Sequence, residues 1–143
     1  MEYRDLLGEV HAALQPDVYL EIGVRNGASL ALSRGKTIGV DPAMADLIRV
    51  STLRPWTKLY RETSDAFFAA REASATLDGG RLELAFIDGL HLFEQVLRDL
   101  IHVEAWAAPG ALIVIHDVLP PTVHSTSREP LRGAWVGDVW KIV

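Results

Sequence analysis

The stretch VYLEIGVRNGAS, residues 18–29, joins an apolar run of strand length to a glycine-containing turn and the start of a helix. Its first five residues suit a buried strand, and Gly23 and Gly27 permit the positive φ angles and the close backbone approach of a tight turn. A helix that follows such a turn offers free N–H groups to a polar or anionic ligand. The stretch therefore predicts a strand–turn–helix unit, and the turn is either an ordinary connection or the site of a ligand.

Four more apolar runs of strand length follow, at residues 37–40, 57–60, 82–87 and 111–115. Short helices are expected between them, over residues 28–33, 43–50 and 65–73. Because continuous apolar strands that alternate with helices indicate a parallel sheet covered on both faces, we expect a doubly wound, Rossmann-like three-layer α/β sandwich. Right-handed crossovers favour a mainly parallel sheet of about five strands in the order 3-2-1-4-5.

Two longer helices are predicted by apolar residues that share one helix face. The first face comprises Tyr3, Leu6, Leu7, Val10 and Leu14, and the second comprises Phe93, Val96, Leu97, Leu100 and Ile101. On the outer side of the second helix, Glu94 and Arg98 are expected to form an i,i+4 ion pair.

Length and composition exclude several classes of protein. A chain of 143 residues with 49% hydrophobic and 23% charged residues fits one globular domain rather than a disordered or fibrous protein. The net charge of −5 argues against general binding to nucleic acid, and the lack of cysteine excludes disulfides and thiolate metal sites. No apolar run approaches the roughly 18 residues that span a bilayer. We expect a single cytoplasmic domain over residues 1–143, with no nucleic-acid or membrane partner.

Polar residues gather where the predicted strands end, at Glu21, Asp41, Asp88, His116 and Asp117. In open α/β sheets, ligands bind beyond the carboxyl ends of the strands. Two nucleotide fingerprints fail here. A dinucleotide motif from Gly23 would need glycine at Arg25 and Ala28, and a P-loop ending at residues 35–37 would need glycine at Leu30.

Asp41, at the end of the second predicted strand, can accept hydrogen bonds from both ribose hydroxyls of a nucleoside. The alternative is a solvated turn aspartate before Pro42. The glycine turn upstream favours the ribose role.

Over nearly its whole length the chain resembles the class I S-adenosylmethionine-dependent methyltransferases. The resemblance implies that residues 21–27 wrap the methionine part of the cofactor, that Asp41 binds the ribose and that residues 63–65 lie near the adenine. Thr63 or Ser64 could instead cap the helix that follows. The implied cofactor-binding residues are Glu21, Gly23, Val24, Asn26, Gly27, Ser29, Asp41, Ser64, Asp65 and Asp88.

Neighbouring fourth and fifth strands would bring Asp88, His116 and Asp117 to one rim, with His91 a turn away. Two carboxylates and an imidazole can hold a divalent metal such as Mg, Mn or Zn, which could lower the pKa of a substrate hydroxyl. The alternatives are a turn-forming Asp88, a core His116 and a His91 that caps a helix.

The same segment resembles the metal-dependent O-methyltransferases that tailor macrolides and sugars. The resemblance implies O-methylation of a small-molecule acceptor, with Asp88 at the first metal position and as a catalytic residue. This chain departs from that branch by Leu90, where the catalytic acid usually stands, and by His116–Asp117 in place of an Asp–Asp pair. His91 is then the natural substitute base, and a histidine ligand suits Mn, Fe or Zn better than Mg.

Residues 118–136 contain three prolines and Gly133, and predict a long loop or lid. In it, Arg128, Arg132 and Trp135 could close over an acceptor, although surface charge is the simpler role for the arginines. The methyltransferase family usually continues with a helix and two more strands, which are missing here. We expect the loop or a homodimer partner to cover the exposed edge of strand five, or the chain to be a truncated form.

Two other functions stay open. A non-catalytic S-adenosylmethionine- or nucleoside-binding module of a biosynthetic complex would suit the short chain and Leu90. A nucleotide-linked oxidoreductase is disfavoured by the failed dinucleotide fingerprint.

Overall fold

A computed structural model describes residues 2–45, 54–130 and 132–143. One parallel sheet runs through it in the order β3-β2-β1-β4-β5. Its strands are β1 (Val18–Ile22), β2 (Lys36–Val40), β3 (Thr57–Tyr60), β4 (Leu82–Ile87) and β5 (Ala107–Ile115). The predicted fold class and strand order are confirmed.

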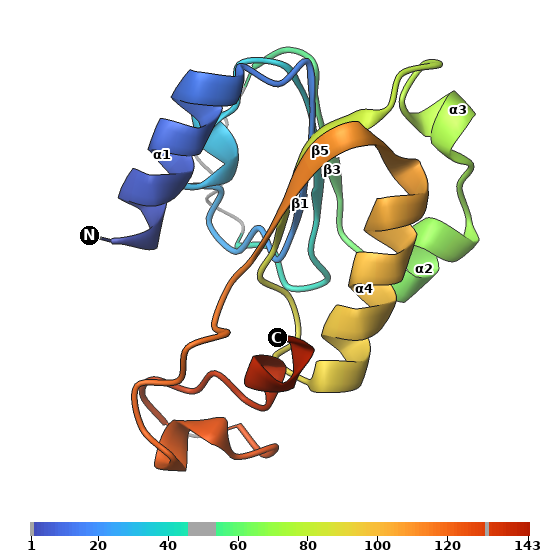
Figure 1. Ribbon diagram of the computed structural model, residues 1–143. Helices are drawn as coiled ribbons and strands as arrows, with labels where there is room; N and C mark the ends of the chain where they lie inside the picture. The colour runs from blue at the N-terminus through green and yellow to red at the C-terminus, as the bar shows by residue number, and fades with distance from the viewer. Residues whose placement is uncertain (1, 46–53, 131) are drawn as a thin grey trace.

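Helices cover both faces of the sheet (Figure 1). Helix α1 (Tyr3–Leu14) and the 3₁₀ turn η1 (Leu30–Leu32) lie on one face, and α2 (Ser64–Ala69), α3 (Ala73–Thr76) and α4 (Phe93–Trp106) lie on the other. The helix expected over residues 65–73 ends at Ala69 as α2, and a separate short helix, α3, begins at Ala73. The helix expected over 28–33 is only η1. The helix expected over 43–50 lies mostly outside the described residues. No helix within the described ranges is long and apolar enough to cross a membrane.

The central strands β1, β2 and β4 are buried on both sides, as their continuous apolar runs predicted, whereas the edge strands β3 and β5 are half-buried or exposed. Alternate residues of β1 separate into two clusters. Leu20 and Ile22 pack with α4 residues such as Val103, whereas Tyr19 packs with Leu7 of α1. This leaves the carboxyl ends of the strands as the edge at which side chains can converge on a ligand.

The predicted apolar helix faces are partly wrong. In α1, Leu6 and Leu14 are each 50% exposed. The buried residues of α1 are Leu7 and His11, and those of α4 are Val96, Asp99, Val103 and Trp106, whereas Leu97 and Ile101 are exposed. The spacing of 3, 4 and 3 residues along α4 is that of one helix stripe. Polar residues within the buried stripes shifted the apparent apolar faces.

The predicted Glu94–Arg98 pair is also wrong. Arg98 instead lies 3.2 Å from Asp65 of α2, and Glu94 pairs with Arg128 in the C-terminal segment. An i,i+4 ion pair on a helix surface is weak, and the ion pairs with Asp65 and Arg128 form in its place. The two side chains therefore connect α4 to α2 and to the C-terminal segment.

Residues 116–130 and 132–143, called the C-terminal segment, run beneath the carboxyl ends of the strands rather than along β5 (Figure 1). The described part of this segment contains two 3₁₀ turns, η3 (His124–Thr126) and η4 (Val139–Ile142). Strand β5 pairs with β4, and no other described strand pairs with it. The C-terminal segment therefore borders the ligand edge of the sheet.

Candidate active site

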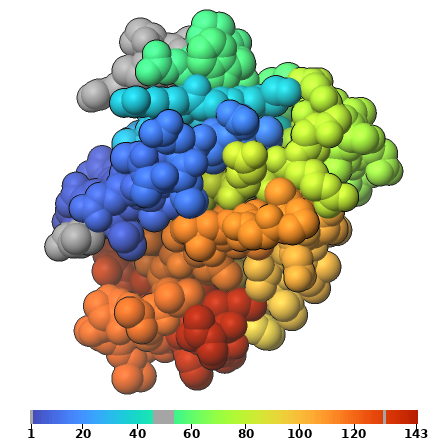
Figure 2. Space-filling view, turned by 45° about the horizontal axis from the view of Figure 1, so that its top comes forward, coloured from blue at the N-terminus to red at the C-terminus, as the bar shows by residue number. Residues whose placement is uncertain are grey.

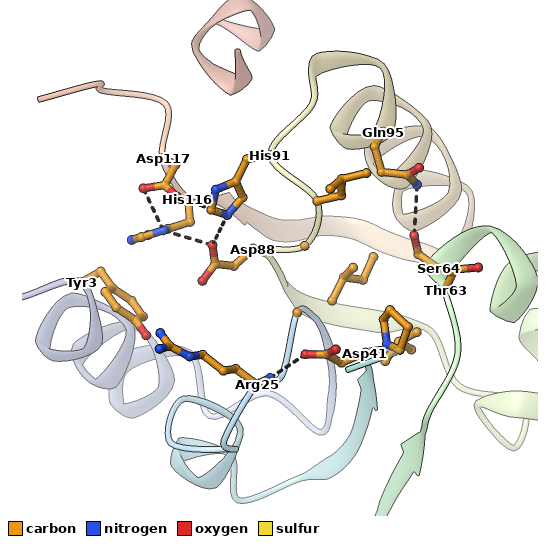
Figure 3. A pocket seen from close by; sticks show the side chains of 16 residues that line it. Tyr3, Arg25, Asp41, Thr63, Ser64, Asp88, His91, Gln95, His116 and Asp117 are labelled. Atoms are coloured by element: carbon orange, nitrogen blue, oxygen red, sulfur yellow. Dashed lines mark hydrogen bonds and ion pairs between the residues drawn. The ribbon is translucent and has the colours of Figure 1, made fainter. Parts of the chain in front are cut away.

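A cavity of about 520 Å³ opens at the carboxyl ends of the strands. Ser64 and Gln95 lie at one side of it and a group of histidines and aspartates lies at the other (Figure 3). The lining residues are Tyr3, Ile22, Gly23, Arg25, Val40, Asp41, Pro42, Thr63, Ser64, Asp88, Gly89, Leu90, His91, Gln95, His116 and Asp117. Its size is within the range of small-molecule sites.

Gly23 brings the turn after β1 against the loop after β4. Its φ is +91°, and a Cβ at this position would lie 2.0 Å from the carbonyl oxygen of Asp88. Only glycine permits this approach. Gly23 thereby forms the cavity wall between the two loops.

Glu21 lies behind that wall. It is 0% exposed, and its carboxylate accepts hydrogen bonds from the hydroxyls of Tyr19 and Ser29, each at 2.7 Å. Burial raises the pKa of Glu21 to about 8, although both hydrogen bonds oppose the shift. Glu21 and Ser29 brace the turn from the side of α1 and do not line the cavity.

The rest of the predicted cofactor turn also lies outside the lining. Val24 is buried in the cluster with α1, and Gly27 is buried with a φ of +75°. Asn26 is exposed, and its side-chain oxygen accepts the Ala28 N–H at 3.2 Å. These residues shape the turn, while Gly23 and Arg25 present it to the cavity.

Asp41 lines the cavity and also organises the backbone around it. Its Oδ2 accepts the Arg25 N–H at 2.6 Å and its Oδ1 accepts the Ala43 N–H at 2.7 Å. Each carboxylate oxygen can accept a further hydrogen bond. The turn role and a ligand role are therefore compatible in the same side chain.

Residues 63–65, at the start of α2, have different roles. Thr63 caps the helix by accepting the Ala66 N–H at 3.2 Å. Ser64 lines the cavity, and its hydroxyl oxygen accepts a hydrogen bond from the Gln95 side-chain amide at 3.1 Å. Asp65 is exposed outside the lining, and it accepts hydrogen bonds from Gln95 and Arg98. Gln95 was missed in the sequence, although its place in the first turn of α4, four residues after His91, was a usable signal.

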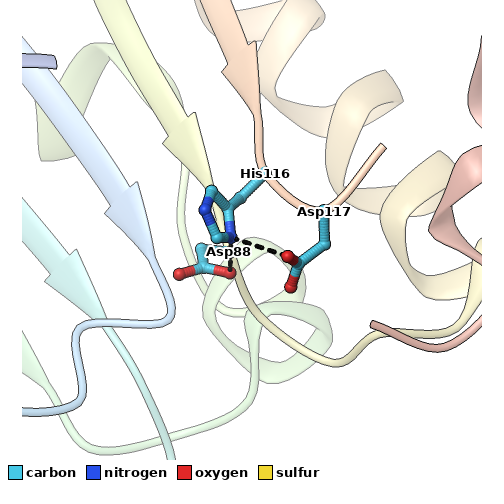
Figure 4. A group of neighbouring side chains, drawn as sticks. All are labelled: Asp88, His116 and Asp117. Carbon is cyan, nitrogen blue, oxygen red and sulfur yellow. Dashed lines mark hydrogen bonds and ion pairs between the residues drawn. The ribbon is translucent and has the colours of Figure 1, made fainter. Parts of the chain in front are cut away.

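Asp88, His91, His116 and Asp117, together called the histidine–aspartate group, converge at the ends of β4 and β5 (Figure 3). Nδ1 of His116 lies 3.1 Å from Asp88 Oδ1 and 3.2 Å from Asp117 Oδ1 (Figure 4). Nε2 of His91 lies 3.4 Å from Asp88 Oδ1 and 3.3 Å from Asp117 Oδ2. The strand order brings these residues together as the sequence predicted.

His91 does not cap α4. The carboxylate of Asp138, from the C-terminal segment, accepts the Phe93 N–H at 2.7 Å instead. Nδ1 of His91 lies 3.0 Å from the carbonyl oxygen of Trp135. Since a carbonyl only accepts, Nδ1 is the protonated nitrogen in this hydrogen bond.

The carboxylates favour the protonated form of both histidines. Hydrogen bonds that His116 donates to Asp117 and Asp88 raise the pKa of His116 to about 10. Burial lowers the pKa of His91, but the hydrogen bond with Asp88 and the charge of Asp117 outweigh it, so the pKa is raised. Burial likewise raises the pKa of Asp88, yet its two histidine partners bring it below its usual value. The group therefore attracts positive charge.

Three members of the group fit a metal ion. One ligand atom each from Asp88, His116 and Asp117 lies within 4.8 Å of the others, so the three can reach a common cation. Two carboxylate oxygens and one imidazole nitrogen form a mixed donor set, which suits Mn, Fe or Zn better than Mg. A metal would have to displace the proton of His116 Nδ1.

Tyr3 is a cavity residue that sequence analysis assigned to the core face of α1. Its ring centroid lies 4.5 Å from that of His116, and burial followed by the charge of Asp88 raises the pKa of its phenol. Tyr3 has the same helical spacing as the core residues of α1, so the spacing alone did not show that this end of the helix borders the cavity. Tyr3 places an aromatic surface beside the histidine–aspartate group.

The predicted closure by Arg128 is wrong, because Arg128 pairs with Glu94 and Asp138 beside α4. Arg132 is exposed and does not line the cavity. The indole of Trp135 contacts the His91 ring in a tilted arrangement, with ring centroids 5.2 Å apart. Of the three, only Trp135 touches the histidine–aspartate group.

Comparisons with known proteins identify a family and a similar fold. A family model described as a methyltransferase domain matches residues 20–118. No curated protein sequence matches significantly. The chain is similar in structure to the O-methyltransferase TomG from Streptomyces achromogenes, with a TM-score of 0.73 and 14% sequence identity. TomG is involved in tomaymycin synthesis, and its structure was solved in complex with SAM. The match covers 97% of this chain and 65% of TomG, so the chain spans less than two thirds of TomG's length.

Proposed function

We propose, from the premise that this chain belongs to the methyltransferase domain family, that it catalyses S-adenosylmethionine-dependent methylation of an oxygen atom on a small-molecule acceptor. The observation that carries the proposal is one cavity with two chemically different sides. Asp41, Ser64 and Gln95 offer hydrogen-bonding groups suited to a nucleoside, and the histidine–aspartate group offers a base and carboxylates.

On the nucleoside side, Asp41 would accept hydrogen bonds from the ribose hydroxyls, and Ser64 would contribute its hydroxyl to binding of the base. Gly23 would let the methionine part approach the backbone between the turns after β1 and β4. The predicted residues behind the wall, Glu21 and Ser29 among them, support the site by holding the turn in place.

When bound, S-adenosylmethionine supplies an electrophilic methyl group, and a divalent cation supplies positive charge that favours an ionised acceptor oxygen. In its neutral, Nδ1–H form, His91 would take the proton of the acceptor hydroxyl at Nε2. That proton would stay on His91 when the acceptor oxygen is methylated and S-adenosylhomocysteine is left without the sulfonium charge. Alignment of the acceptor between Tyr3 and His91 supplies much of the rate.

Asp88, His116 and Asp117 would hold the cation. Protein purified without chelator should then contain Mn, Fe or Zn in place of Mg, and a titration of activity should show the same preference. Full methyl transfer in excess EDTA would refute the metal and leave the cofactor assignment standing.

The alternative of a non-catalytic binding module is favoured by Leu90, which is 51% exposed and lines the cavity where the related branch carries an acid. Turnover separates the two proposals. Labelled methyl groups should pass from S-adenosylmethionine to members of a panel of phenols, catechols and sugars.

The matched variants are His91→Ala and His124→Ala, since His124 is exposed and outside the cavity lining. His91→Ala should lose on the order of 10²–10⁴-fold in turnover with cofactor affinity unchanged. His124→Ala should keep both. Tight cofactor binding with no transfer to any acceptor would favour the binding module.

A further inference from the structure

Four residues of the C-terminal segment, 135–138, form a clasp over His91. The Trp135 carbonyl accepts the His91 Nδ1–H at 3.0 Å, and the indole lies over the imidazole with an interplanar angle of 30°. The Asp138 N–H donates to the carbonyl of His91 at 3.3 Å. Backbone and side chain of His91 are therefore both held by a segment more than 40 residues away in sequence.

The clasp is anchored at both of its ends. The Trp135 indole N–H donates to the carbonyl of Ser127 at 2.6 Å. Asp138, only 2% exposed, accepts the Phe93 N–H and pairs with Arg128 and Lys141. Figure 2 shows this C-terminal segment, in orange and red, packed beside α4 in yellow. These contacts fix the position of the Trp135 carbonyl.

Gly137 determines how closely the clasp approaches. Its φ is +57°, and a Cβ there would lie 1.7 Å from the carbonyl oxygen of His91. Any side chain at this position would displace the clasp from His91. Gly133, four residues earlier, also has a positive φ, of +99°, but a Cβ there would meet nothing within 4 Å.

The two nitrogens of the His91 ring face different acceptors. Nδ1 faces the Trp135 carbonyl, whereas Nε2 faces Asp88 and Asp117. Because a carbonyl only accepts, Nδ1 carries a proton in this contact. The Trp135 carbonyl therefore determines which edge of the ring faces the carboxylates and the cavity.

We propose that Trp135 is a positioning residue, whose carbonyl and indole hold the His91 ring with Nδ1–H bound and Nε2 directed towards Asp88 and Asp117. The role of Nε2 in catalysis rests on the proposed methyl transfer. The clasp itself is a property of the chain without ligand, so it can be tested independently of turnover.

The test is an NMR experiment on protein with ¹⁵N-labelled histidine, without metal or acceptor. A hydrogen-bonded, covered Nδ1–H exchanges slowly with water, whereas the exposed ring of His124 serves as a fast-exchanging reference. In the wild type and in Gly133→Ala, the His91 Nδ1–H should be observed. In Gly137→Ala and Trp135→Ala, its exchange should be at least tenfold faster.

Calorimetry with S-adenosylhomocysteine accompanies each variant, and affinities within about threefold of wild type show that the cavity is intact. An Nδ1–H of wild-type His91 that exchanges as fast as that of His124 would overturn the proposal. So would a folded Trp135→Ala protein with unchanged exchange, even if Gly137→Ala failed to fold. Loss of exchange protection to the same extent in Gly133→Ala would show general loosening instead. Absence of S-adenosylhomocysteine binding in the wild type would refute the proposed function while the exchange result still decided the clasp.

Discussion

Replacing Asp41 with alanine should weaken the binding of S-adenosylhomocysteine by roughly 10- to 150-fold. Hydrogen bonds to a charged group contribute about 1.5–3 kcal/mol, and each 1.4 kcal/mol is about tenfold in affinity. The structure leaves both oxygens of Asp41 in the cavity wall, each with capacity for one more hydrogen bond beyond those from Arg25 and Ala43. Calorimetry at one salt concentration measures the difference.

The same backbone contacts complicate the interpretation, because alanine also releases the N–H groups of Arg25 and Ala43. A ligand-side control separates the effects. An analogue without the 2′ and 3′ hydroxyls should bind wild type and Asp41→Ala with affinities that differ by less than about threefold, since it never made the ribose bonds. Asp65→Ala is the protein-side control, because Asp65 is exposed outside the cavity lining, and it should leave the affinity within about twofold.

Equal affinity of wild type and folded Asp41→Ala for S-adenosylhomocysteine would remove Asp41 from the site. An equal loss for the complete ligand and for the analogue would assign Asp41 to the turn alone.

Three stability predictions follow from buried polar groups and are measured by chemical denaturation. Because the pKa of Glu21 is raised to about 8, the folded chain keeps a proton that the unfolded chain loses, and the free energy of unfolding should fall by up to about 1.4 kcal/mol per pH unit between pH 5 and 8. Glu21→Gln should remove this pH dependence. An unchanged pH dependence in that variant would contradict the assignment. Burial lowers the pKa of His11 to about 4, and its ring nitrogens have no hydrogen-bond partner among the described residues, so the free energy of unfolding should fall as the pH drops from 6.5 towards 4. His11→Phe keeps a ring against Tyr19, and it should raise the free energy of unfolding by roughly 1–2 kcal/mol more at pH 5 than at pH 8. An equal effect at both pH values would refute this. Asp138→Ala should cost about 1–2 kcal/mol, since α4 loses its only side-chain cap among the described contacts, and no loss would show that water replaces it.

The apolar runs and the polar residues that follow them were sufficient to predict the order of the strands and the convergence of the histidine–aspartate group at one edge of the sheet. Continuous apolar strands followed by Asp88 and by His116–Asp117 leave few arrangements once parallel order is assumed. The same logic placed Gly23 and Asp41 at the cavity, because both end a strand at its carboxyl edge.

The remaining features depend on tertiary packing that a linear pattern does not encode. Glu21 lies one residue before the end of β1, whereas Asp41 follows the end of β2. The alternation of side chains within β1 therefore turns Glu21 toward Tyr19 and Ser29 instead of the cavity. The clasp at Trp135 joins His91 across 44 positions, and no spacing rule links the two. The stripe of α4 was misassigned because Asp99 is buried in it, where composition favours an apolar residue.

The most direct test of the central claim is calorimetric titration of the purified chain with S-adenosylmethionine, S-adenosylhomocysteine and NAD. The account predicts that both sulfur nucleosides bind with a stoichiometry of one per chain, because Asp41 in the cavity can bind a ribose. It predicts no binding of NAD, because Arg25 and Ala28 stand where the dinucleotide motif needs glycine. Binding of NAD without binding of either sulfur nucleoside would contradict it.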